Sequence, residues 1–239
     1  MTMKQRILTP FCMAIMLAGC GVNDREIASA DQNAVIKVPT NTVNPSRVSA
    51  ARCPSTEALG RQFDAVVPSD TINADLFDAA VLHYTNLRRC ANGVPPVAGD
   101  AALRQSATFH SDDMAALNFF SHTSPVPGRT SLQDRLKFVG FEFQSASENI
   151  AQRARLQLIS GRSFTVNDRA TCNFSYDGQT IQPHTYRTMA RDFVQAWEDS
   201  PGHRKNMFNP AYTRLGTGGS FKPNSRNCGD VVATQNFAS

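Results

Sequence analysis

Apolar residues recur every three or four positions after Asn73, which is the spacing of an amphipathic helix. The apolar stripe consists of Phe77, Ala80, Val81, Tyr84 and Leu87. We expect this helix to stop near Gly93, because Pro95 and Pro96 follow and proline does not continue a helix. The pattern therefore predicts one long helix at the start of the apolar part of the chain.

Three further helices are predicted farther along. The second begins after Asp100, a residue type that caps helix N-termini, and its apolar face carries Leu103, Ala107, His110, Met114 and Leu117. The third covers residues 132–139, with Thr130 or Ser131 as its cap and Gly140 as its end. The fourth ends before Pro201 and carries Met189, Phe193, Ala196 and Trp197 at helical spacing.

Strand signals are weaker and lie at residues 149–151, 215–221 and 231–237. Helices that are separate from a few strands, without regular alternation of the two, are typical of an α+β fold in which helices cover a small sheet. Residues 152–187 interrupt the pattern with five arginines and Cys172. They are interpreted as a long loop or hairpin insertion that a disulfide holds.

Composition narrows the class of protein. The chain has 239 residues, of which 41% are hydrophobic and 18% charged, and its net charge is +4. This composition excludes a largely disordered chain and a polytopic membrane protein, and the length allows a sizeable core. No clustered basic stripe of the kind that binds nucleic acid is present.

The first twenty residues have a short cationic start and an apolar run that is too short to span a bilayer. They end in Leu17, Ala18, Gly19 and Cys20, a sequence that resembles the lipobox of bacterial lipoproteins. The resemblance implies that residues 1–19 are a lipoprotein signal peptide and that Cys20 is acylated, which would anchor the chain to a membrane. If the organism is Gram-negative, Gly21 after the cysteine implies outer-membrane sorting, facing the periplasm or the cell surface.

Residues 20–52 are polar and without apolar periodicity, so we expect the lipidated cysteine to be followed by a flexible tether. Residues 53–239 are predicted to form the folded domain. Its four cysteines allow three disulfide pairings in an exported chain. The pairing Cys53–Cys90 and Cys172–Cys228 is favoured, because it ties the N-terminal segment to the first helix and the insertion to the C-terminal segment. The sequence contains no Cys-x-x-Cys pair, so the cysteines do not have the spacing of a zinc site.

Three short polar stretches stand at element boundaries. They are FFSHTSP at residues 119–125, SENIA at 147–151 and AWEDSPGHRKN at 196–206, and they follow NLR at 86–88 and SDDMA at 111–115. In order and spacing they resemble the CAP superfamily (SCP domains; the cysteine-rich secretory, antigen-five and pathogenesis-related group), most closely its bacterial branch. The resemblance covers about residues 74–237.

The resemblance implies an α–β–α sandwich with a small, mainly antiparallel central sheet. It also implies a cleft lined by His122, His203 and Glu148. Many eukaryotic members carry a second glutamate three residues after the tryptophan, where this sequence has Ser200. Glu198 does not replace it, because a helix would turn it about 200° away from position 200. Because the second carboxylate is missing, a mechanism that requires two histidines and two glutamates has no support in this sequence.

Two imidazoles and a carboxylate are a possible divalent-metal set, so weak zinc binding by His122, His203 and Glu148 is one expectation. We expect its affinity to fall below a pH of about 6.5, the ordinary histidine pKa, and folding not to require a metal. Glu148 can instead hydrogen-bond one histidine and fix its tautomer. His110, in an apolar stripe, is interpreted as a partly buried histidine rather than a ligand.

The sequence favours an extracytoplasmic, lipid-anchored domain that binds a lipid, another small hydrophobic molecule or an envelope partner through the His/Glu cleft. It does not establish catalysis. The alternative is a metal-assisted hydrolase of peptide or cell-envelope polymer. A serine hydrolase is disfavoured, because no Gly-x-Ser-x-Gly elbow surrounds Ser121, Ser124 or Ser200. Neither the ligand nor the oligomeric state follows from the sequence.

Overall fold

The structure is a computed structural model that describes residues 51–56, 59–224 and 226–239. The predicted signal peptide, the predicted lipidation site Cys20 and nearly all of the predicted tether lie outside the described residues. Within the described part of the chain, no helix is long and apolar enough to cross a membrane.

A four-stranded sheet forms the centre of the domain, with strand order β1-β6-β7-β2. The strands are β1 (Ala98–Gly99), β2 (Ala146–Ala154), β6 (Arg214–Lys222) and β7 (Asp230–Ala238). The pairs β6·β7 and β2·β7 are antiparallel over nine residues each, and only the short β1 runs parallel to β6. The three predicted strands are confirmed, and all nine residues of β7 are buried.

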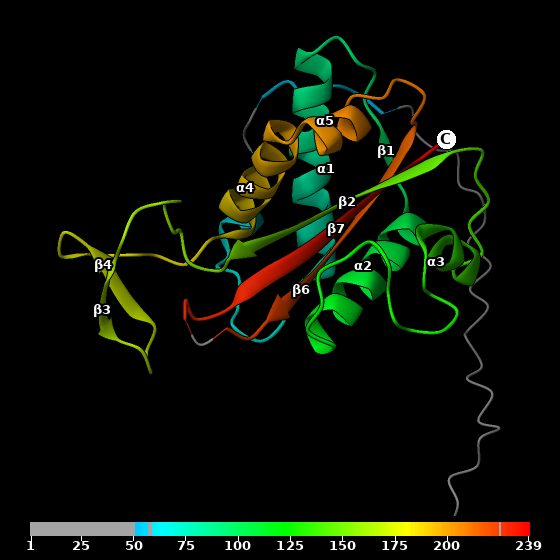
Figure 1. The fold of residues 1–239 in the computed structure, drawn as a ribbon. Coiled ribbons are helices and arrows are strands. Elements are labelled where there is room, and N and C mark those ends of the chain that lie inside the picture. Colours follow the sequence, from blue (N-terminus) through cyan, green and yellow to red (C-terminus); the bar gives the residue numbers. More distant parts are fainter. Residues whose placement is uncertain (1–50, 57–58, 225) are drawn as a thin grey trace, which may run out of the picture. The chain divides into compact units, whose positions relative to one another are not determined.

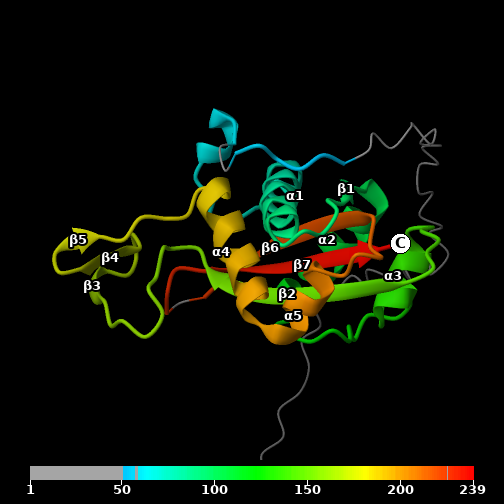
Figure 2. The same cartoon turned by 90° about the horizontal axis from the view of Figure 1, so that it is seen from above.

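Helices cover both faces of this sheet, as Figure 1 shows, so the predicted α–β–α sandwich is confirmed. On one face lie α1 (Ala74–Ala91), α4 (Tyr186–Asp199) and α5 (Pro201–Met207), and on the other lie α2 (Ala101–Ala116) and α3 (Leu132–Phe138). A short 3-10 helix, η1 (Arg61–Asp64), contacts α1 and α4. The same layers are visible from above in Figure 2.

Glycines in β6 let α2 approach the sheet closely. A Cβ atom on Gly218 would lie 2.2 Å from the backbone nitrogen of Thr108, and one on Gly216 would lie 2.0 Å from that of Arg104. Both helix residues belong to α2. Because successive strand residues point to opposite faces, Gly219 meets the ring of Phe77 from α1 instead. The run of glycines therefore sets the distance between the sheet and its helices.

Helix caps agree with the sequence signals. Asn73 and Asp100 accept hydrogen bonds from the first-turn amides of α1 and α2, and Ser131 forms a capping box with Asp134 at the start of α3. The fourth predicted helix ends before Pro201, as expected, with Ser200 as its C-cap. Ser200 and Pro201 also begin α5, because proline is accepted at the first helical position, where no backbone N–H donor is needed.

The main core lies between the sheet and the layer of α1 and α4. Phe193 contacts Phe77 edge-on and packs against Trp197, with ring centroids 5.6 and 5.5 Å apart. All three side chains are fully buried. The predicted apolar faces of these two helices therefore meet each other and the sheet.

A buried arginine at the end of α1 holds the chain that follows α5. Arg89 is fully buried and donates hydrogen bonds to four backbone carbonyls, those of Pro95, Met207, Asn209 and Tyr212, over 2.5–3.2 Å. Burial lowers its pKa to about 10, so the guanidinium still carries its charge at neutral pH. Arg89 therefore connects the end of α1 to the approach to β6.

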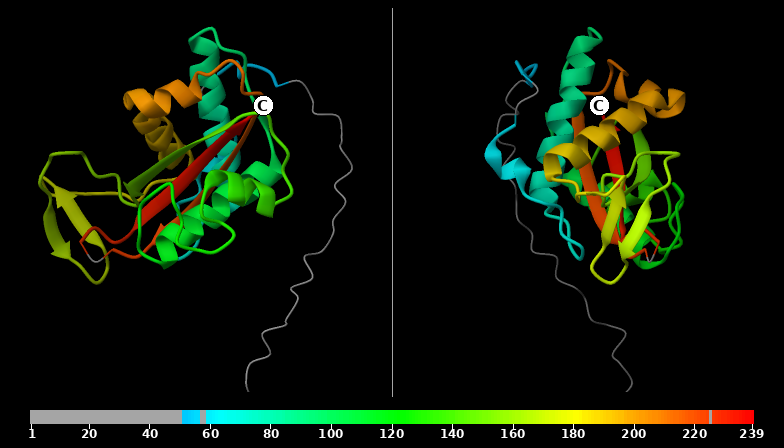
Figure 3. Two further views of the ribbon diagram at one scale, coloured as in Figure 1. Left: turned by 45° about the vertical axis from the view of Figure 1, so that its right-hand side comes forward. Right: turned by 90° about the vertical axis from the view of Figure 1, so that its left-hand side faces the viewer.

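Between β2 and α4 the chain forms a second, three-stranded sheet with order β3-β4-β5. Its strands are β3 (Thr165–Asp168), β4 (Asn173–Tyr176) and β5 (Gln179–Thr180), and Figure 3 shows them extending away from the central sheet. Leu156, Phe174 and Ile181 give this region a small core of its own. The disulfide Cys172–Cys228 joins it to the β6–β7 connection, and Cys53–Cys90 joins the N-terminal segment to α1. Both favoured pairings are thus present.

Candidate functional site

Glu148 is the centre of the candidate site. It lies on β2, and its carboxylate is almost completely buried. The Nδ1 atom of His122 lies 2.9 Å from one carboxylate oxygen, and the Nη2 atom of Arg135 lies 2.7 Å from the other. Both oxygens of the buried carboxylate are therefore occupied, one by an imidazole and one by a guanidinium.

Arg135 ties this carboxylate to the loop that carries His122. It lies on α3, is fully buried, and donates hydrogen bonds to the backbone carbonyls of His122, Arg129 and Thr130 over 3.1–3.3 Å. The loop joins α2 to α3. Arg135 thus fixes both the carboxylate and the backbone of the histidine that binds it.

His110 lies behind the pair, on α2, with no exposed surface. Its Nε2–H donates to the carbonyl of Ser121 at 2.9 Å and lies 3.7 Å from the Glu148 carboxylate. Burial lowers its pKa, so it is neutral at neutral pH. Its interpretation as a buried histidine is confirmed, and its Nδ1 atom has no hydrogen-bond partner among the described residues.

His203 enters the site from α5, which an asparagine network holds against β2. Asn149 donates to the backbone carbonyl of His203 at 3.2 Å, and Asn206 donates to the side-chain oxygen of Asn149 at 2.9 Å. Burial, with a smaller electrostatic contribution from His122, lowers the pKa of His203. Ser200 is at the junction of α4 and α5, where its side chain makes no cap hydrogen bond.

The electrostatics keep the glutamate ionised. Burial alone would raise the pKa of Glu148, but the His122 hydrogen bond and the Arg135 charge, with a smaller contribution from His110, outweigh it and hold the pKa below its usual value. At neutral pH the site therefore contains one carboxylate, one buried guanidinium and the neutral imidazoles of His110 and His203.

The hydrogen bond to Glu148 fixes which nitrogen of His122 is available. Because an ionised carboxylate only accepts hydrogen bonds, Nδ1 of His122 carries the proton. In the neutral ring, Nε2 is then the hydrogen-bond acceptor. The side chain is 56% exposed, so the imidazole is accessible to a ligand or to a water molecule.

The arrangement does not fit the expected three-ligand zinc centre. No group of three or more His, Cys, Asp or Glu side chains within residues 51–56, 59–224 and 226–239 has the arrangement of a metal site. Glu148 is unsuited as a ligand because Arg135 occupies one oxygen and His122 the other. The expected weak zinc binding by His122, His203 and Glu148 stays a prediction.

The sequence indicated His122, Glu148 and His203, but not the residues that hold them. Arg135 resembles any charged residue of a short helix, and no sequence signal marks it as buried. Asn149 lies beside Glu148 within the SENIA stretch, and Asn206 ends the SPGHRKN stretch, so their place in these motifs was the available signal.

These residues lie within a match to a known protein family. The family model described as "CAP: Cysteine-rich secretory protein family" matches residues 82–237, which is well over half of the chain. The chain belongs to the CAP family. His122, Arg135, Glu148 and His203 all lie inside the matched part of this CAP protein.

Two curated relatives come from Bacillus subtilis strain 168. The uncharacterised protein YkwD is 30% identical over 200 residues, which cover 81% of this chain and 54% of YkwD. The uncharacterised membrane protein YlbC is 32% identical over 139 residues, which cover 58% of this chain and 30% of YlbC. The CAP chain thus spans about half or less of the length of these relatives.

Among solved structures, the chain is similar to an extracellular protein with an SCP domain from Bacillus anthracis. The two are 28% identical, the TM-score is 0.47, and the match covers 69% of this chain and 41% of the other. An outer surface protein from Borrelia burgdorferi is 14% identical, with a TM-score of 0.45, over 71% of this chain and 98% of the other.

Proposed function

We propose that this CAP domain works outside the cytoplasm and binds a ligand, a lipid or other small hydrophobic molecule or an envelope partner, at the surface formed by His122, Glu148 and His203. The observation that carries the proposal is the hydrogen bond between His122 and the buried Glu148, which leaves Nε2 of an exposed imidazole as a fixed acceptor. A ligand with a hydroxyl or N–H group next to an apolar body would match it.

An extracytoplasmic, lipid-anchored location is part of the proposal. The two disulfides support an oxidising compartment. The N-terminal sequence that ends in Cys20 supports cleavage at a lipobox and acylation of the cysteine. The anchor would keep the binding surface near a membrane.

The hydrolase alternative depends on the same hydrogen bond. A histidine held by a carboxylate has the form of a general base, which could take a proton from water. The reaction would be hydrolysis of peptide or envelope polymer. It would differ from the metal-assisted reaction expected from the sequence, because His122 and Arg135 already occupy the two oxygens of Glu148. Binding and hydrolysis differ in one respect that can be measured, because only hydrolysis releases a product.

The first prediction concerns the ligand. Native mass spectrometry of the protein purified from its own envelope is expected to show a bound molecule, and His122→Ala is expected to reduce the bound fraction about tenfold, because the fixed acceptor is lost. Lys205→Ala, an exposed change on the neighbouring α5, is the matched control and should retain the molecule. A wild-type protein without any bound mass, or a His122→Ala variant that retains it, would contradict the binding proposal.

Turnover is measured on the same preparations. If wild type releases fragments from peptide or envelope polymer and His122→Ala and Glu148→Gln do not, the hydrolase hypothesis replaces the binding one. Circular dichroism of both variants shows whether the fold is kept.

The second prediction concerns the anchor. Cys20→Ser is expected to abolish acylation and either release a soluble product or leave an unprocessed precursor, because serine has no thiol to acylate. The measurement is membrane fractionation together with the intact mass of the chain. Cys12→Ser, which changes a cysteine inside the predicted signal peptide, is the control and should leave anchoring intact. Membrane association of Cys20→Ser equal to wild type, with no acyl mass on the native chain, would contradict the anchor.

A further inference from the structure

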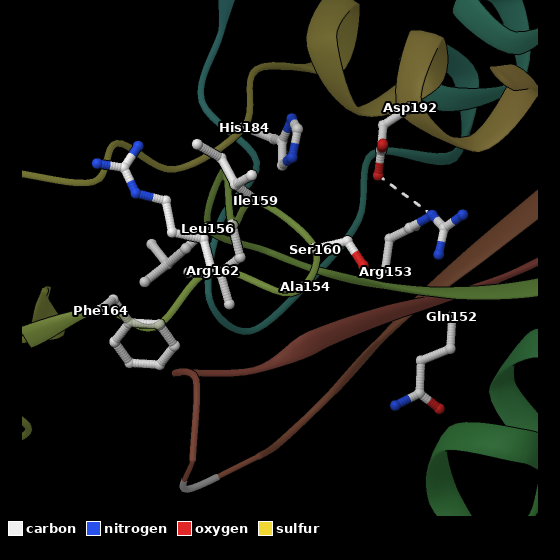
Figure 4. Close-up of a pocket in the computed structure, with 11 residues that line it drawn as sticks. Gln152, Arg153, Ala154, Leu156, Ile159, Ser160, Arg162, Phe164, His184 and Asp192 are labelled. Atoms are coloured by element: carbon white, nitrogen blue, oxygen red, sulfur yellow. Dashed lines mark ion pairs between the residues drawn. The ribbon is translucent and has the colours of Figure 1, made fainter. Parts of the chain in front are cut away.

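A cavity of about 460 Å³ lies between the end of β2, the segment that leads into β3, and α4. This volume is in the range of small-molecule sites. Figure 4 shows its lining, which includes Arg153, Leu156, Ile159, Arg162, Phe164 and His184. We call it the insertion pocket.

The insertion pocket is distinct from the His/Glu site. None of His122, Glu148 and His203 lines it. Its β2 residues, 152–154, follow Glu148 by four to six positions on the same strand, which corresponds to about 13–20 Å at the rise of a β-strand. A ligand in the insertion pocket would therefore occupy a second place on the domain.

One part of the lining is apolar, and other residues of the insertion pack against it. Leu156 is almost fully buried, and the ring of Phe164 stacks on Phe174 of β4 with centroids 5.1 Å apart. Ile159 is 51% exposed, although it is a large aliphatic residue. Its backbone N–H donates to the hydroxyl of Tyr176 at 2.8 Å, which holds this stretch of chain in place. An apolar surface that is rigid and partly open to water favours binding of an apolar group.

The other part of the lining is cationic. The guanidinium of Arg162 lies 4.5 Å from the centre of the Tyr176 ring, which orients it, and its ion-pair partner Asp177 is 86% exposed. Arg153 pairs with Asp192 at 3.3 Å, and both side chains are about 40% exposed. Figure 4 shows the two guanidinium groups on opposite sides of the aliphatic residues.

These ion pairs leave the arginines able to bind another anion. Exposed ion pairs contribute little energy because water screens them, and a guanidinium has five N–H donors, more than one carboxylate can fill. His184, also in the lining, is kept neutral at neutral pH because burial lowers its pKa. The lining side chains carry the positive charges of Arg153 and Arg162 and the negative charge of Asp192, and Asp177, the exposed partner of Arg162, lies outside the lining.

We propose that the insertion pocket binds a small amphipathic anion, with its apolar body on Leu156, Ile159 and Phe164 and its carboxylate or phosphate on Arg162. Arg153, at the other end, is a second contact for a longer or doubly charged molecule. A guanidinium binds both kinds of anion through paired N–H donors, so the pocket chemistry is shared by the two.

The test uses the whole protein and a photoreactive diazirine analogue of octanoate. After irradiation, digestion and mass spectrometry, we expect the label on residues 152–164. Arg162→Gln is expected to reduce labelling at least fivefold, and Arg204→Gln, which removes an exposed arginine from α5, should not. Ile159→Asn should also reduce labelling, whereas Val166→Asn, a matched change of another exposed aliphatic residue that does not line the pocket, should not.

Competition identifies the chemistry. Octanoate and octyl phosphate are expected to displace the label, and whichever competes at lower concentration identifies the preferred head group. Octylamine should not compete because it is a cation, and acetate and inorganic phosphate should not compete because they lack the apolar body. Equal competition by octylamine or by acetate, labelling elsewhere, or labelling that Arg162→Gln leaves unchanged would overturn the proposal. His122→Ala should label as wild type does, which separates this result from the fate of the His/Glu site.

Discussion

Arg89→Met is expected to lower the free energy of unfolding by about 3–5 kcal/mol. The substitution removes four hydrogen bonds at once and leaves the carbonyls of Pro95, Met207, Asn209 and Tyr212 without their donor. Unmade buried hydrogen bonds cost about 1–3 kcal/mol each, and local relaxation recovers part of that sum. Methionine fills much of the same volume, so the effect reports on the donors rather than on a cavity.

Chemical denaturation measures this change, and the neighbouring residue supplies the control. Arg88 is 40% exposed and contacts Gln195 and Glu198 on α4. Arg88→Met removes the same charge from the same helix and should cost less than about 1 kcal/mol. Arg89→Lys should lower the free energy of unfolding by an amount between those of Arg88→Met and Arg89→Met, because one ammonium cannot reach four acceptors. Equal losses for Arg88→Met and Arg89→Met would contradict the role of Arg89 as a buried donor.

Arg135→Met is also expected to lower the free energy of unfolding by about 3–5 kcal/mol at neutral pH, for a different reason. It leaves Glu148 buried without its cation, and breaking a buried ion pair from one side costs this much. Adding Glu148→Gln in the same chain should recover much of the loss, because the uncompensated charge is then gone. Lys137→Met, on the exposed side of the same helix α3, is the control and should be nearly neutral.

The loss in Arg135→Met should also depend on pH. In wild type the lowered pKa of Glu148 contributes stability that is present above the ordinary value of 4.5 and is lost as pH falls through the folded-state value. Without Arg135 we expect burial to dominate and to raise the pKa above 4.5, so that ionised Glu148 destabilises the variant. The difference between wild type and Arg135→Met should therefore shrink as pH falls towards 4.5, and a difference that does not change with pH would contradict this account.

Much of the fold could be predicted because it depends on local patterns. The apolar stripes that predicted α1, α2 and α4 lie mainly on the buried faces, except that Leu117 follows the end of α2 and is exposed. Asp100 and Ser131 cap the helices that they were expected to cap. The sequence allowed three cysteine pairings, and the favoured one, which joins Cys90 and Cys228 to nearby segments, is present. The helix α5 was not predicted, because Pro201 and Gly202 are read as an end when nothing shows that a new helix begins there.

The sequence indicated the histidines and the glutamate of the site but not the buried arginines, for a physical reason. His122, Glu148 and His203 were identified because the short polar stretches that contain them resemble the motifs of the CAP superfamily. Arg89 and Arg135 could not be identified in this way, since arginine is usually exposed and its burial depends on acceptors that are distant in sequence. The insertion pocket was not predicted either, because its lining combines β2, α4 and the segment between them, which looked like a polar excursion.

The place of β7 in the sheet has a consequence for the order of synthesis. This strand lies between β2 and β6, and Ala154 of β2 pairs with Asp230 of β7. When β2 leaves the ribosome, β7, the strand that will pair with it, has not yet been made. The edge of β6 that pairs with β7 also has no partner until then. The nascent chain can form single helices, but the sheet closes only after β7 has been synthesised. Contacts this distant in sequence also slow folding. Because β7 is the central partner of both long strands, the sheet cannot be completed on the ribosome until residues 230–238 have been made.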